Sequence, residues 1–423
     1  MYNISYRIEV LVMAHIYTGL DIGNGEIKLV VVNANDNSYH VLASTSVKTL
    51  GLKKNIIYDE KKLKTSLLNA IKLTEEKIGM KIREVILTLP ANRASMTMEN
   101  GLVNIKGEKV RGKDIDAVIK DTVLNTYDDT RELISCLPIS FTVDDEASVI
   151  NPLGENGDKL FLKAVVATSP KEEIYPFINI VRSLGINITD IIYNTQADYY
   201  TIASKELDRK MGAIINIGED ITSIGTFNKG IMIKNSYIPV GSSSVDKDIA
   251  FIYKIDLKEA GKLKETFALA SSRYADSNDS VTVVDKETKK ITISQIQISE
   301  VIESRIKEIL KLAKNEINRL TKREISYIIV VGGISELAGF NYIVEETLGR
   351  ASSCYNMKEL GIRHNKYTSA YGSCKYFDKK CMLKEEDINM FDFEEIENFV
   401  SPKKKNVIND NMTNKFFGHF FEN

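Results

Sequence analysis

Two short segments of the chain carry residues whose types and spacing suit phosphate binding. The first reads DIGNGEIK at 21–28, and the second repeats its plan as NIGEDITS at 216–223. Each lies between two apolar, β-branched runs, which predicts a strand, a tight glycine turn and a returning strand. Two such hairpins in one chain can face each other and hold a polyphosphate from both sides. An ordinary solvated hairpin turn is the alternative for either segment taken alone, because Asn-Gly is also a favoured turn dipeptide.

The first segment holds three kinds of phosphate-binding group. Backbone amides reach phosphate oxygens only where no side chain intervenes, and Gly23 and Gly25, with Asn24 between them, meet that need. Asp21 ends the incoming strand and could hold a magnesium ion through its water shell. Lys28 on the returning strand could place an ammonium charge on a phosphate.

The second segment preserves part of this set. Asn216 takes the place of the aspartate, and Gly218 takes the place of the first glycine. A third element, Gly332-Gly333, follows an apolar strand at 327–331 and precedes a helical pattern. A strand, two glycines and a helix allow the backbone to press against a purine or a sugar. We therefore expect the three elements to converge on one nucleotide.

Composition narrows the function classes. The chain has 423 residues and a net charge of −2, so we expect at least two domains and no nucleic-acid partner. Its four cysteines and four histidines lack metal-ligand spacing, which fits a reducing cytoplasm. No apolar run approaches the ~18 residues needed to span a bilayer. Residues 1–15 form an N-terminal extension without a cleavage signal, and translation could begin at Met1 or Met13.

The periodicity of the chain predicts two α/β halves with an insertion in the first. Strands are expected within 16–46, at 85–89 and at 186–192, with helices at 60–77 and 172–184. The hydrophobic pattern changes at 91–167, where stretches of alternating polarity and one helical pattern at 112–124 predict a small inserted domain with its own sheet. The first half thus comprises 16–90 and 168–207.

The second half is expected at 208–376, with a subdomain at about 255–320. Its predicted elements are strands within 212–238, helices at 244–253 and 257–270, a hairpin at 281–293 and a long helix at 299–320. Beyond Tyr376 the globular pattern fades into acidic residues and three consecutive lysines, so 377–411 is expected to be a linker.

The last twelve residues, 412–423, form an amphipathic pattern. One face of a helical wheel collects a methionine and four phenylalanines, namely Met412, Phe416, Phe417, Phe420 and Phe421. Such a tail suits an interfacial membrane helix or a peptide that docks in a partner's groove. A tail that folds back on the body of the protein is the alternative.

Several segments together resemble the bacterial cell-division protein family FtsA, within the actin, Hsp70 and sugar-kinase superfamily. The segment LDIG at 20–23 resembles the family's first phosphate loop. The segments GLVNI at 101–105 and NPLGENG at 151–157 resemble parts of the family's inserted subdomain. The segment VGG at 331–333 resembles the family's adenosine loop. Two further matching segments are IPVG at 238–241 and VIESR at 301–305. The amphipathic tail after a variable linker is also typical of the family.

The resemblance implies an actin-like ATPase fold, with two ribonuclease-H-like halves and an inserted small α+β subdomain. It implies ATP with Mg²⁺ bound between the halves, and it adds Gly241 and Lys264 to the expected nucleotide site. It also implies self-assembly, tethering of FtsZ to the cytoplasmic face of the cell membrane at the division site, and recruitment of other divisome proteins. By resemblance, the FtsZ-binding surface would lie within 281–319, where Lys307, Lys311 and Arg319 are expected to be exposed.

Three departures from the family pattern bear on hydrolysis. The usual second loop has an aspartate where this chain has Asn216, and glycines where it has Glu219 and Asp220. An amide is a poor base, and an acid beside a phosphate repels it. In the helix that contacts the nucleoside, Lys264 is retained but the usual glutamate is Gly261. We therefore expect nucleotide to bind weakly and to be scarcely hydrolysed, and we assign no catalytic residue.

Two other functions remain open at this point. One is a soluble actin-like partner protein of pilus assembly, which would not need the phenylalanine-rich tail. The other is a small-molecule kinase of the same superfamily, which would need a catalytic base beside a substrate pocket.

Overall fold

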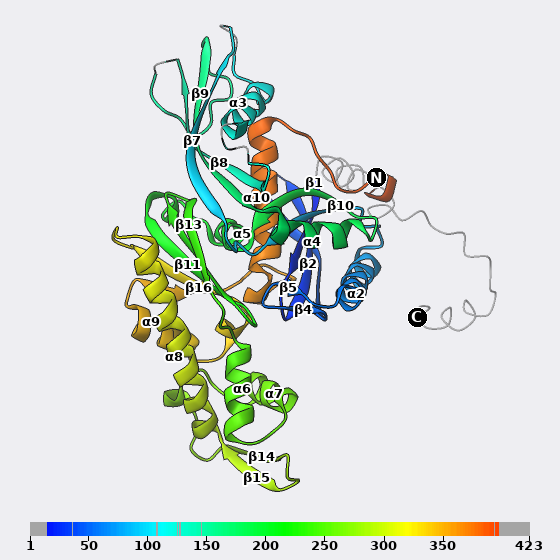
Figure 1. Ribbon diagram of the computed structural model, residues 1–423, viewed down its shortest axis with the longest axis vertical. Coiled ribbons are helices and arrows are strands. Elements are labelled where there is room, and N and C mark those ends of the chain that lie inside the picture. The colour runs from blue at the N-terminus through cyan, green and yellow to red at the C-terminus, as the bar shows by residue number, and fades with distance from the viewer. Residues whose placement is uncertain are drawn as a thin grey trace, which may run out of the picture.

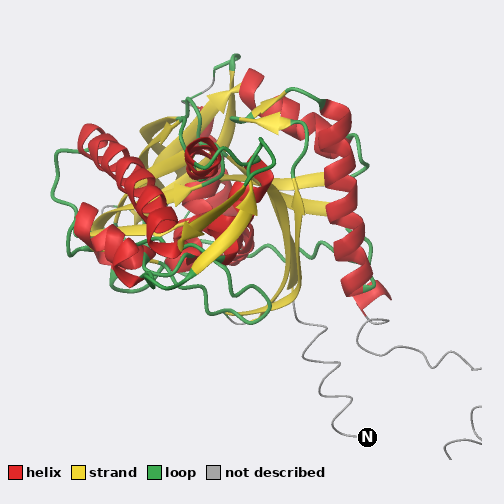
Figure 2. Cartoon of the chain, turned by 90° about the horizontal axis from the view of Figure 1, so that it is seen from below, coloured by secondary structure: helices red, strands yellow, loops and turns green. Residues whose placement is uncertain are grey.

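The chain folds into two α/β halves, each built on a five-stranded sheet. The computed structural model describes residues 15–35, 37–106, 109–124, 126, 128–144, 146–392 and 394–396. The two sheets lie side by side in Figure 1, with the inserted domain at the upper end and an extension of helices and one hairpin at the lower end. Helices surround the strands when the molecule is seen from below (Figure 2).

The first sheet has the strand order β10-β6-β1-β2-β3. Strand β1 pairs antiparallel with β2 and parallel with β6, and β2 pairs antiparallel with β3. Two short strands, β4 and β5, form a separate ladder beside it. The strands are β1 (His15–Ile22), β2 (Glu26–Asn35), β3 (Ser38–Lys48), β4 (Leu52–Lys53), β5 (Ile56–Ile57), β6 (Glu84–Leu89) and β10 (Asn187–Tyr193).

The second sheet repeats this plan with the order β13-β12-β11-β16-β17. Here β11 pairs antiparallel with β12 and parallel with β16, as β1 does with β2 and β6. The repetition places the two glycine hairpins at equivalent positions of the two halves. The strands are β11 (Met211–Ile217), β12 (Thr222–Asn228), β13 (Ile231–Ile238), β16 (Tyr327–Val331) and β17 (Ser352–Cys354).

The inserted domain has its own three-stranded antiparallel sheet, ordered β7-β9-β8, and its own apolar core. Its edge strand β8 is interrupted by bulges and contains Pro138, a residue that edge strands tolerate because its missing N–H faces no partner. Its elements are β7 (Ser95–Asn104), α3 (Gly112–Leu124), β8 (Arg131–Val143) and β9 (Lys159–Pro170).

Helices complete both halves, and local signals fix several of their ends. Helix α2 (Glu60–Ile78) begins at an Asp59 cap and ends at Gly79 in the left-handed conformation. Helix α8 (Gln295–Leu320) begins with a reciprocal capping box between Ser294 and Gln297. The others are α4 (Lys171–Arg182), α5 (Asn194–Ile202), α6 (Ser243–Ile252), α7 (Leu257–Thr266), α9 (Phe340–Leu348) and α10 (Thr368–Lys384), with the hairpin β14 (Ser280–Val284) and β15 (Lys290–Ser294).

Two helices at the centre of the molecule were not expected. Helices α5 and α10 pack against each other, and α10 also contacts β1, β2 and β6 of the first sheet (Figure 1). Both are buried on nearly every side. Their buried faces include polar residues such as Gln196, Asp198 and Ser373, so neither helix shows a clear apolar stripe, which explains why the sequence did not reveal them.

Helix α10 also corrects two expected boundaries. Residues 368–376 were assigned to the second half, yet the helix that they begin packs on the first sheet. The linker was expected from residue 377, but α10 continues to Lys384, and Met390, Phe391 and Ile396 are buried in the first core. These apolar side chains lie among acidic neighbours that stay exposed, so the local composition resembled a linker although the chain remains packed.

Candidate nucleotide site

The turns of the two glycine hairpins meet between the halves, at a place that we call the hairpin junction (21–28 and 216–223). A Cβ atom at Gly25 would overlap the carboxylate of Glu219 from the opposite hairpin. Beside it, the Lys54 backbone N–H donates to Asp220 Oδ2 at 3.3 Å. The two hairpins therefore face each other, as the sequence predicted, and acidic side chains of the second contact the backbone of the first half.

Asp21 and Lys28 form a nearly buried ion pair at the base of the first hairpin. Lys28 Nζ lies 2.9 Å from Asp21 Oδ2, and the two side chains are only 14% and 13% exposed. The Thr88 hydroxyl donates to the other oxygen, Oδ1, at 2.7 Å. Burial alone would lower the pKa of Lys28, but the Asp21 carboxylate raises it above its ordinary value overall, so the ammonium stays charged.

These contacts bear on the magnesium ion expected at Asp21. Both carboxylate oxygens already accept hydrogen bonds, from Lys28 and from Thr88. A hydrated cation at Asp21 would have to compete with the Lys28 ammonium for the same oxygen. Across the part of the chain that the structure describes, His, Cys, Asp and Glu side chains form no group of three or more suited to a metal.

The first turn is held tightly by its own neighbours. Asn24 donates to Asn55 Oδ1 at 2.8 Å and accepts from the Asn55 backbone N–H at 2.8 Å. The Thr49 hydroxyl donates to the Gly23 carbonyl at 2.7 Å, and the Thr49 N–H donates to the Gly25 carbonyl at 2.8 Å. The predicted turn residues thus shape the loop, and the Asn24 side chain is engaged within the first half.

A buried carboxylate lies behind the second hairpin. Asn216 Nδ2 donates to Asp198 Oδ2 at 2.6 Å, and the hydroxyls of Thr368 and Ser369 donate to Asp198 Oδ1 at 2.7 and 2.8 Å. Burial raises the pKa of Asp198 to about 6, although these three hydrogen bonds act to lower it. This cluster joins α5, β11 and the start of α10, so it ties both halves together at the hairpin junction.

The second turn packs on the start of helix α6. The N–H groups of Ser242 and Ser243 donate to the carbonyls of Gly218 and Glu219 at 2.9 and 2.8 Å. A Cβ at Gly241 would lie 2.5 Å from both carbonyl oxygens, so this position requires glycine. The amides at this helix N-terminus, a common anion site in proteins, are therefore already satisfied by the loop itself.

Lysine and acid residues are paired beside the second turn. Lys264 Nζ lies 2.8 Å from Asp246 Oδ1, with the lysine side chain 9% exposed. Burial raises the pKa of Glu219, and the neighbouring charges of Asp220 and Asp246 add to that effect. The side chains here thus repel further negative charge more than the usual glycines would.

The Gly332-Gly333 corner closes the other side of the hairpin junction. Gly332 has φ +106° and approaches the Ile217 backbone, so only glycine fits there. Gly333 is less crowded, since the nearest atoms to a Cβ would be His364 Cε1 at 3.7 Å and Lys366 Cβ at 3.9 Å, which are ordinary van der Waals contacts. Lys366 in turn bridges to Glu26 of the first hairpin at 3.1 Å.

The residues around the hairpin junction fit a nucleotide only in part. The charged Lys28 suits a phosphate, and the less crowded side of Gly333 suits a nucleoside. The second turn does not suit a terminal phosphate, because Glu219 fills the space against Gly25 and Asp220 lies next to it. We therefore derive no hydrolytic step through a bound triphosphate.

The structure brings together all of the residues expected from the sequence at this site. Sequence reasoning missed Thr88, Asp198, Thr368 and Ser369, which reach the junction from elements distant in the chain. Nothing in the local pattern marks them, because three of them lie in α5 and α10, which are buried on nearly every side.

The expected membrane-anchor residues lie outside the described part of the chain, as does 1–14 of the N-terminal extension. They are Met412, Phe416, Phe417, Phe420 and Phe421. Among the residues described, no helix combines the length and apolar character needed to cross a bilayer.

The basic residues expected on α8 as a partner surface differ in their surroundings. Lys307 is not the exposed cation that was expected, since it pairs with Glu303 and Glu346, each at 2.8 Å. Arg319 pairs with Glu316 at 2.8 Å but keeps a 66% exposed side chain. Lys311 is exposed. The i, i+4 spacing of Glu303 and Lys307 on one helix face explains the pairing.

The comparisons with solved structures agree with the observed fold. One match is a structure described as the PilM-PilN type IV pilus biogenesis complex, with a TM-score of 0.55 and 17% identity, covering 84% of this chain and 96% of that one. MreB5 of Spiroplasma citri bound to ADP matches with a TM-score of 0.55 and 13% identity, covering 88% of this chain and 98% of that one. These likenesses show an actin-like fold.

The sequence comparisons identify the family. The model for cell division protein FtsA matches residues 213–372, and the model for the SHS2 domain inserted in FtsA matches residues 92–168. The FtsA of Streptococcus pneumoniae is 26% identical over 352 residues, 82% of this chain and 77% of that protein. The FtsA of Bacillus subtilis is 24% identical over 85% of this chain and 83% of its own length. This chain belongs to the FtsA family of cell-division proteins, as a divergent member with the actin-like fold.

Proposed function

We propose that this protein is an actin-like scaffold of cell division that tethers FtsZ filaments to the inner face of the cytoplasmic membrane. It self-assembles, attaches through its amphipathic tail at 412–423 and recruits other divisome proteins at the division site. The observation that carries the proposal is the pair of facing hairpins together with an inserted domain that matches the FtsA-specific one. That inserted domain favours this role over pilus assembly or small-molecule phosphorylation.

Within this role, nucleotide binds weakly and is scarcely hydrolysed. The first hairpin offers the charged Lys28, whereas the second offers acids, and its Asn216 side chain is occupied with Asp198. A purified-protein assay decides the point. Robust magnesium-dependent ATP turnover that is lost in Asp21→Ala would defeat this part of the proposal.

Membrane tethering has a direct test. The full chain is incubated with vesicles of anionic bacterial lipids and with ATP, sedimented, and viewed by electron microscopy for membrane-bound filaments. We expect co-sedimentation that is strongly reduced when 412–423 is deleted, because the tail supplies the large apolar face. Vesicle binding that is unchanged by the deletion would remove the tail from its proposed role.

FtsZ recruitment to those vesicles tests the partner surface. Of the three cations named for this surface, Lys311 and Arg319 on α8 are exposed, and reversing both charges should weaken recruitment of FtsZ. Lys307→Glu is a poor test of the surface, because it would break two ion pairs within the protein. Full recruitment by the Lys311→Glu, Arg319→Glu double variant would place the contact elsewhere.

A further inference from the structure

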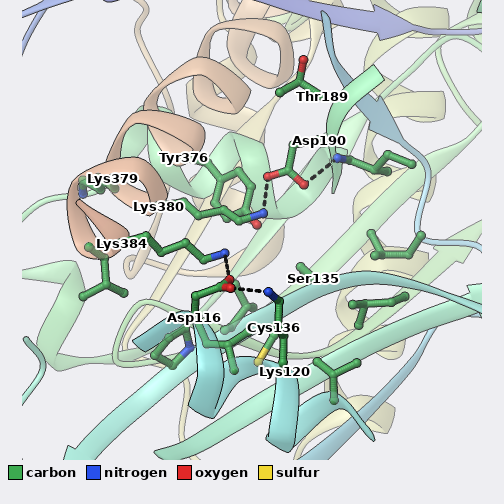
Figure 3. A pocket seen from close by; sticks show the side chains of 18 of the residues that line it. Asp116, Lys120, Ser135, Cys136, Thr189, Asp190, Tyr376, Lys379, Lys380 and Lys384 are labelled. Atoms are coloured by element: carbon green, nitrogen blue, oxygen red, sulfur yellow. Dashed lines mark hydrogen bonds and ion pairs between the residues drawn. The ribbon is translucent and has the colours of Figure 1, made fainter. Parts of the chain in front are cut away.

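A large groove separates the inserted domain from the first half (Figure 3). Its volume is about 1130 Å³, and its walls come from α3 and β8 on one side and from β10, α4 and α10 on the other. Strands β8 and β10 are each the outermost strand of their sheet, so the groove lies between two open sheet edges. It lies apart from the hairpin junction and shares none of its residues.

The charged groups of the groove largely satisfy one another. Asp116 accepts from Lys120 at 2.5 Å and from Lys384 at 2.6 Å, and Asp190 pairs with Lys380 at 2.6 Å, as the dashed lines of Figure 3 show. Burial raises the pKa of Cys136 to about 12, so its thiol is neutral. The groove therefore offers a ligand apolar contact more than free charge.

Exposed apolar side chains gather along the groove. Leu124 is 71% exposed and Ile150 is 85% exposed, and Leu133 and Met382 are also exposed. All four line the groove. A cluster of this kind, bordered by lysines, marks an interaction site more often than a chance surface. The volume exceeds the ~300–1,000 Å³ typical of small-molecule pockets, which favours a peptide segment as the occupant.

The described chain ends beside β10, one of the strands that line this groove. Glu395, near the last described residue, pairs with Arg83 at 2.8 Å, and the Arg83 carbonyl accepts from the Asn187 N–H at 2.8 Å. Asn187 begins β10, whose next residues line the groove. Residues 397–411 then separate this point from Met412. A chain of that length has a root-mean-square reach of roughly 20 Å, enough to return to a neighbouring surface.

We propose that the phenylalanine-rich segment 412–421 docks in this groove of its own chain when no membrane is available. The segment carries four phenylalanines and one methionine at helical spacing, which is an apolar ligand for an apolar groove. The same face then either fills the groove or enters the bilayer, so docking regulates the anchor. This inference rests on the proposed membrane role of the tail.

Cys136 provides a reporter within the groove. Cys354 is a matched control, because it too is partly buried, its pKa is likewise raised by burial to about 12, and it lies in the second half. The full chain is treated with a maleimide reagent, and the labelling rate of each cysteine is followed by peptide mass spectrometry. With an effective concentration near 1 mM and a dissociation constant of ~0.1 mM, docking protects Cys136 roughly tenfold.

Deletion of 412–423, or replacement of the four phenylalanines by serine in the full chain, should raise Cys136 labelling roughly tenfold and leave Cys354 unchanged. Adding a synthetic 412–423 peptide to the deletion protein should restore protection. The Leu124→Asp, Ile150→Asp variant should also expose Cys136, whereas Phe251→Asp, at an equally exposed residue on α6, should not. Both substitution sites are exposed, so folding is spared.

Anionic vesicles should raise Cys136 labelling of the intact chain to the level of the deletion protein. Equal Cys136 rates in the intact and deletion proteins without vesicles would overturn the inference. Protection that disappears on dilution would also overturn it, because the occupant would then be a second copy. The membrane role of the tail is tested separately. Vesicle co-sedimentation that does not depend on the tail would contradict that role, whereas docking in the groove is still reported by protection of Cys136 in the absence of vesicles.

Discussion

Glu219 of the second hairpin lies with its carboxylate against the backbone of Gly25 in the first. No side chain fits at residue 25 without displacing this carboxylate. The glycine that would admit a phosphate therefore admits an acid from the opposite hairpin, and the acid keeps the two halves in contact at the turn. This relationship makes the hairpin junction a contact between halves as much as a nucleotide site.

Replacing Glu219 by glycine should strengthen nucleotide binding. The change removes both the obstruction and a like charge near the phosphates; at ~4 Å and an effective dielectric of 20 such a charge costs up to ~4 kcal/mol. Screening at a partly open site reduces this cost, so we expect affinity to rise roughly tenfold, about 1.4 kcal/mol. The readout is fluorescence of an ATP analogue, aided by the absence of tryptophan from the chain.

Glu219→Gln serves as the matched control for charge, since it keeps the volume of the side chain. An equal gain in nucleotide affinity in both variants would mean that the negative charge of Glu219 weakens binding. A gain in Glu219→Gly alone would mean that the volume of the side chain obstructs the site. An affinity that stays at the wild-type level in both variants would show that Glu219 does not obstruct the site.

Asp198 should make folding stability depend on pH. Its pKa rises from an unfolded value of 3.8 to about 6 in the fold. The native state therefore favours the protonated acid, and the stability gained from it is complete below pH ~4 and lost as pH rises to ~6. A shift of about two units corresponds to ~3 kcal/mol. Asp198→Asn should remove this fall, as measured by urea unfolding between pH 4 and 7.

The wild-type protein at pH 4 is the reference for this comparison. The free energies of unfolding of the wild type and of Asp198→Asn should differ more at pH 7 than at pH 4. An unchanged pH profile in Asp198→Asn would mean that the carboxyl is ionised in the fold at an ordinary pKa.

The Asp21–Lys28 pair should show strong coupling in a double-mutant cycle. Removing either partner leaves the other charge nearly buried and unpaired, which typically costs ~3–5 kcal/mol. We expect the Asp21→Ala, Lys28→Ala double variant to lose less stability than the two single losses added together, as measured by denaturant unfolding. Simple additivity would show that the pair does not act as a unit.

Two glycine substitutions should change stability in opposite directions. A Cβ at Gly372 on α10 would overlap the Ala197 carbonyl, so Gly372→Ala forces α5 and α10 apart and should cost more than ~2 kcal/mol. At Gly261 on α7 the nearest atoms to a Cβ, those of Asp246, are 3.7 Å away. Gly261→Ala should therefore stabilise the helix by ~0.5–1 kcal/mol. Thermal unfolding of both variants tests the contrast.

The sequence was most informative where structure is local. Both hairpins could be predicted because glycine turns between β-branched runs form from neighbouring residues. Helix α8 could be predicted from its apolar stripe, although it begins at Gln295, after the Ser294 cap, and not at the expected residue 299. Helix α10 could not be predicted, because its burial on nearly all sides removes the contrast between faces on which such predictions depend. The same helix carries Thr368 and Ser369 to the hairpin junction, so two of its residues were missed together.

By itself the sequence determined which residues have the types and spacing that suit phosphate binding, that the second hairpin is acidic, and that residues 412–421 carry an apolar face at helical spacing. Only the tertiary structure decided that Glu219 lies on Gly25, that Asn216 is bound to Asp198, and that a groove opens between the inserted domain and the first sheet. The physical reason is that the first set depends on residue type and short spacing. The second set depends on how two sheets and two buried helices pack, which brings together residues far apart in the chain.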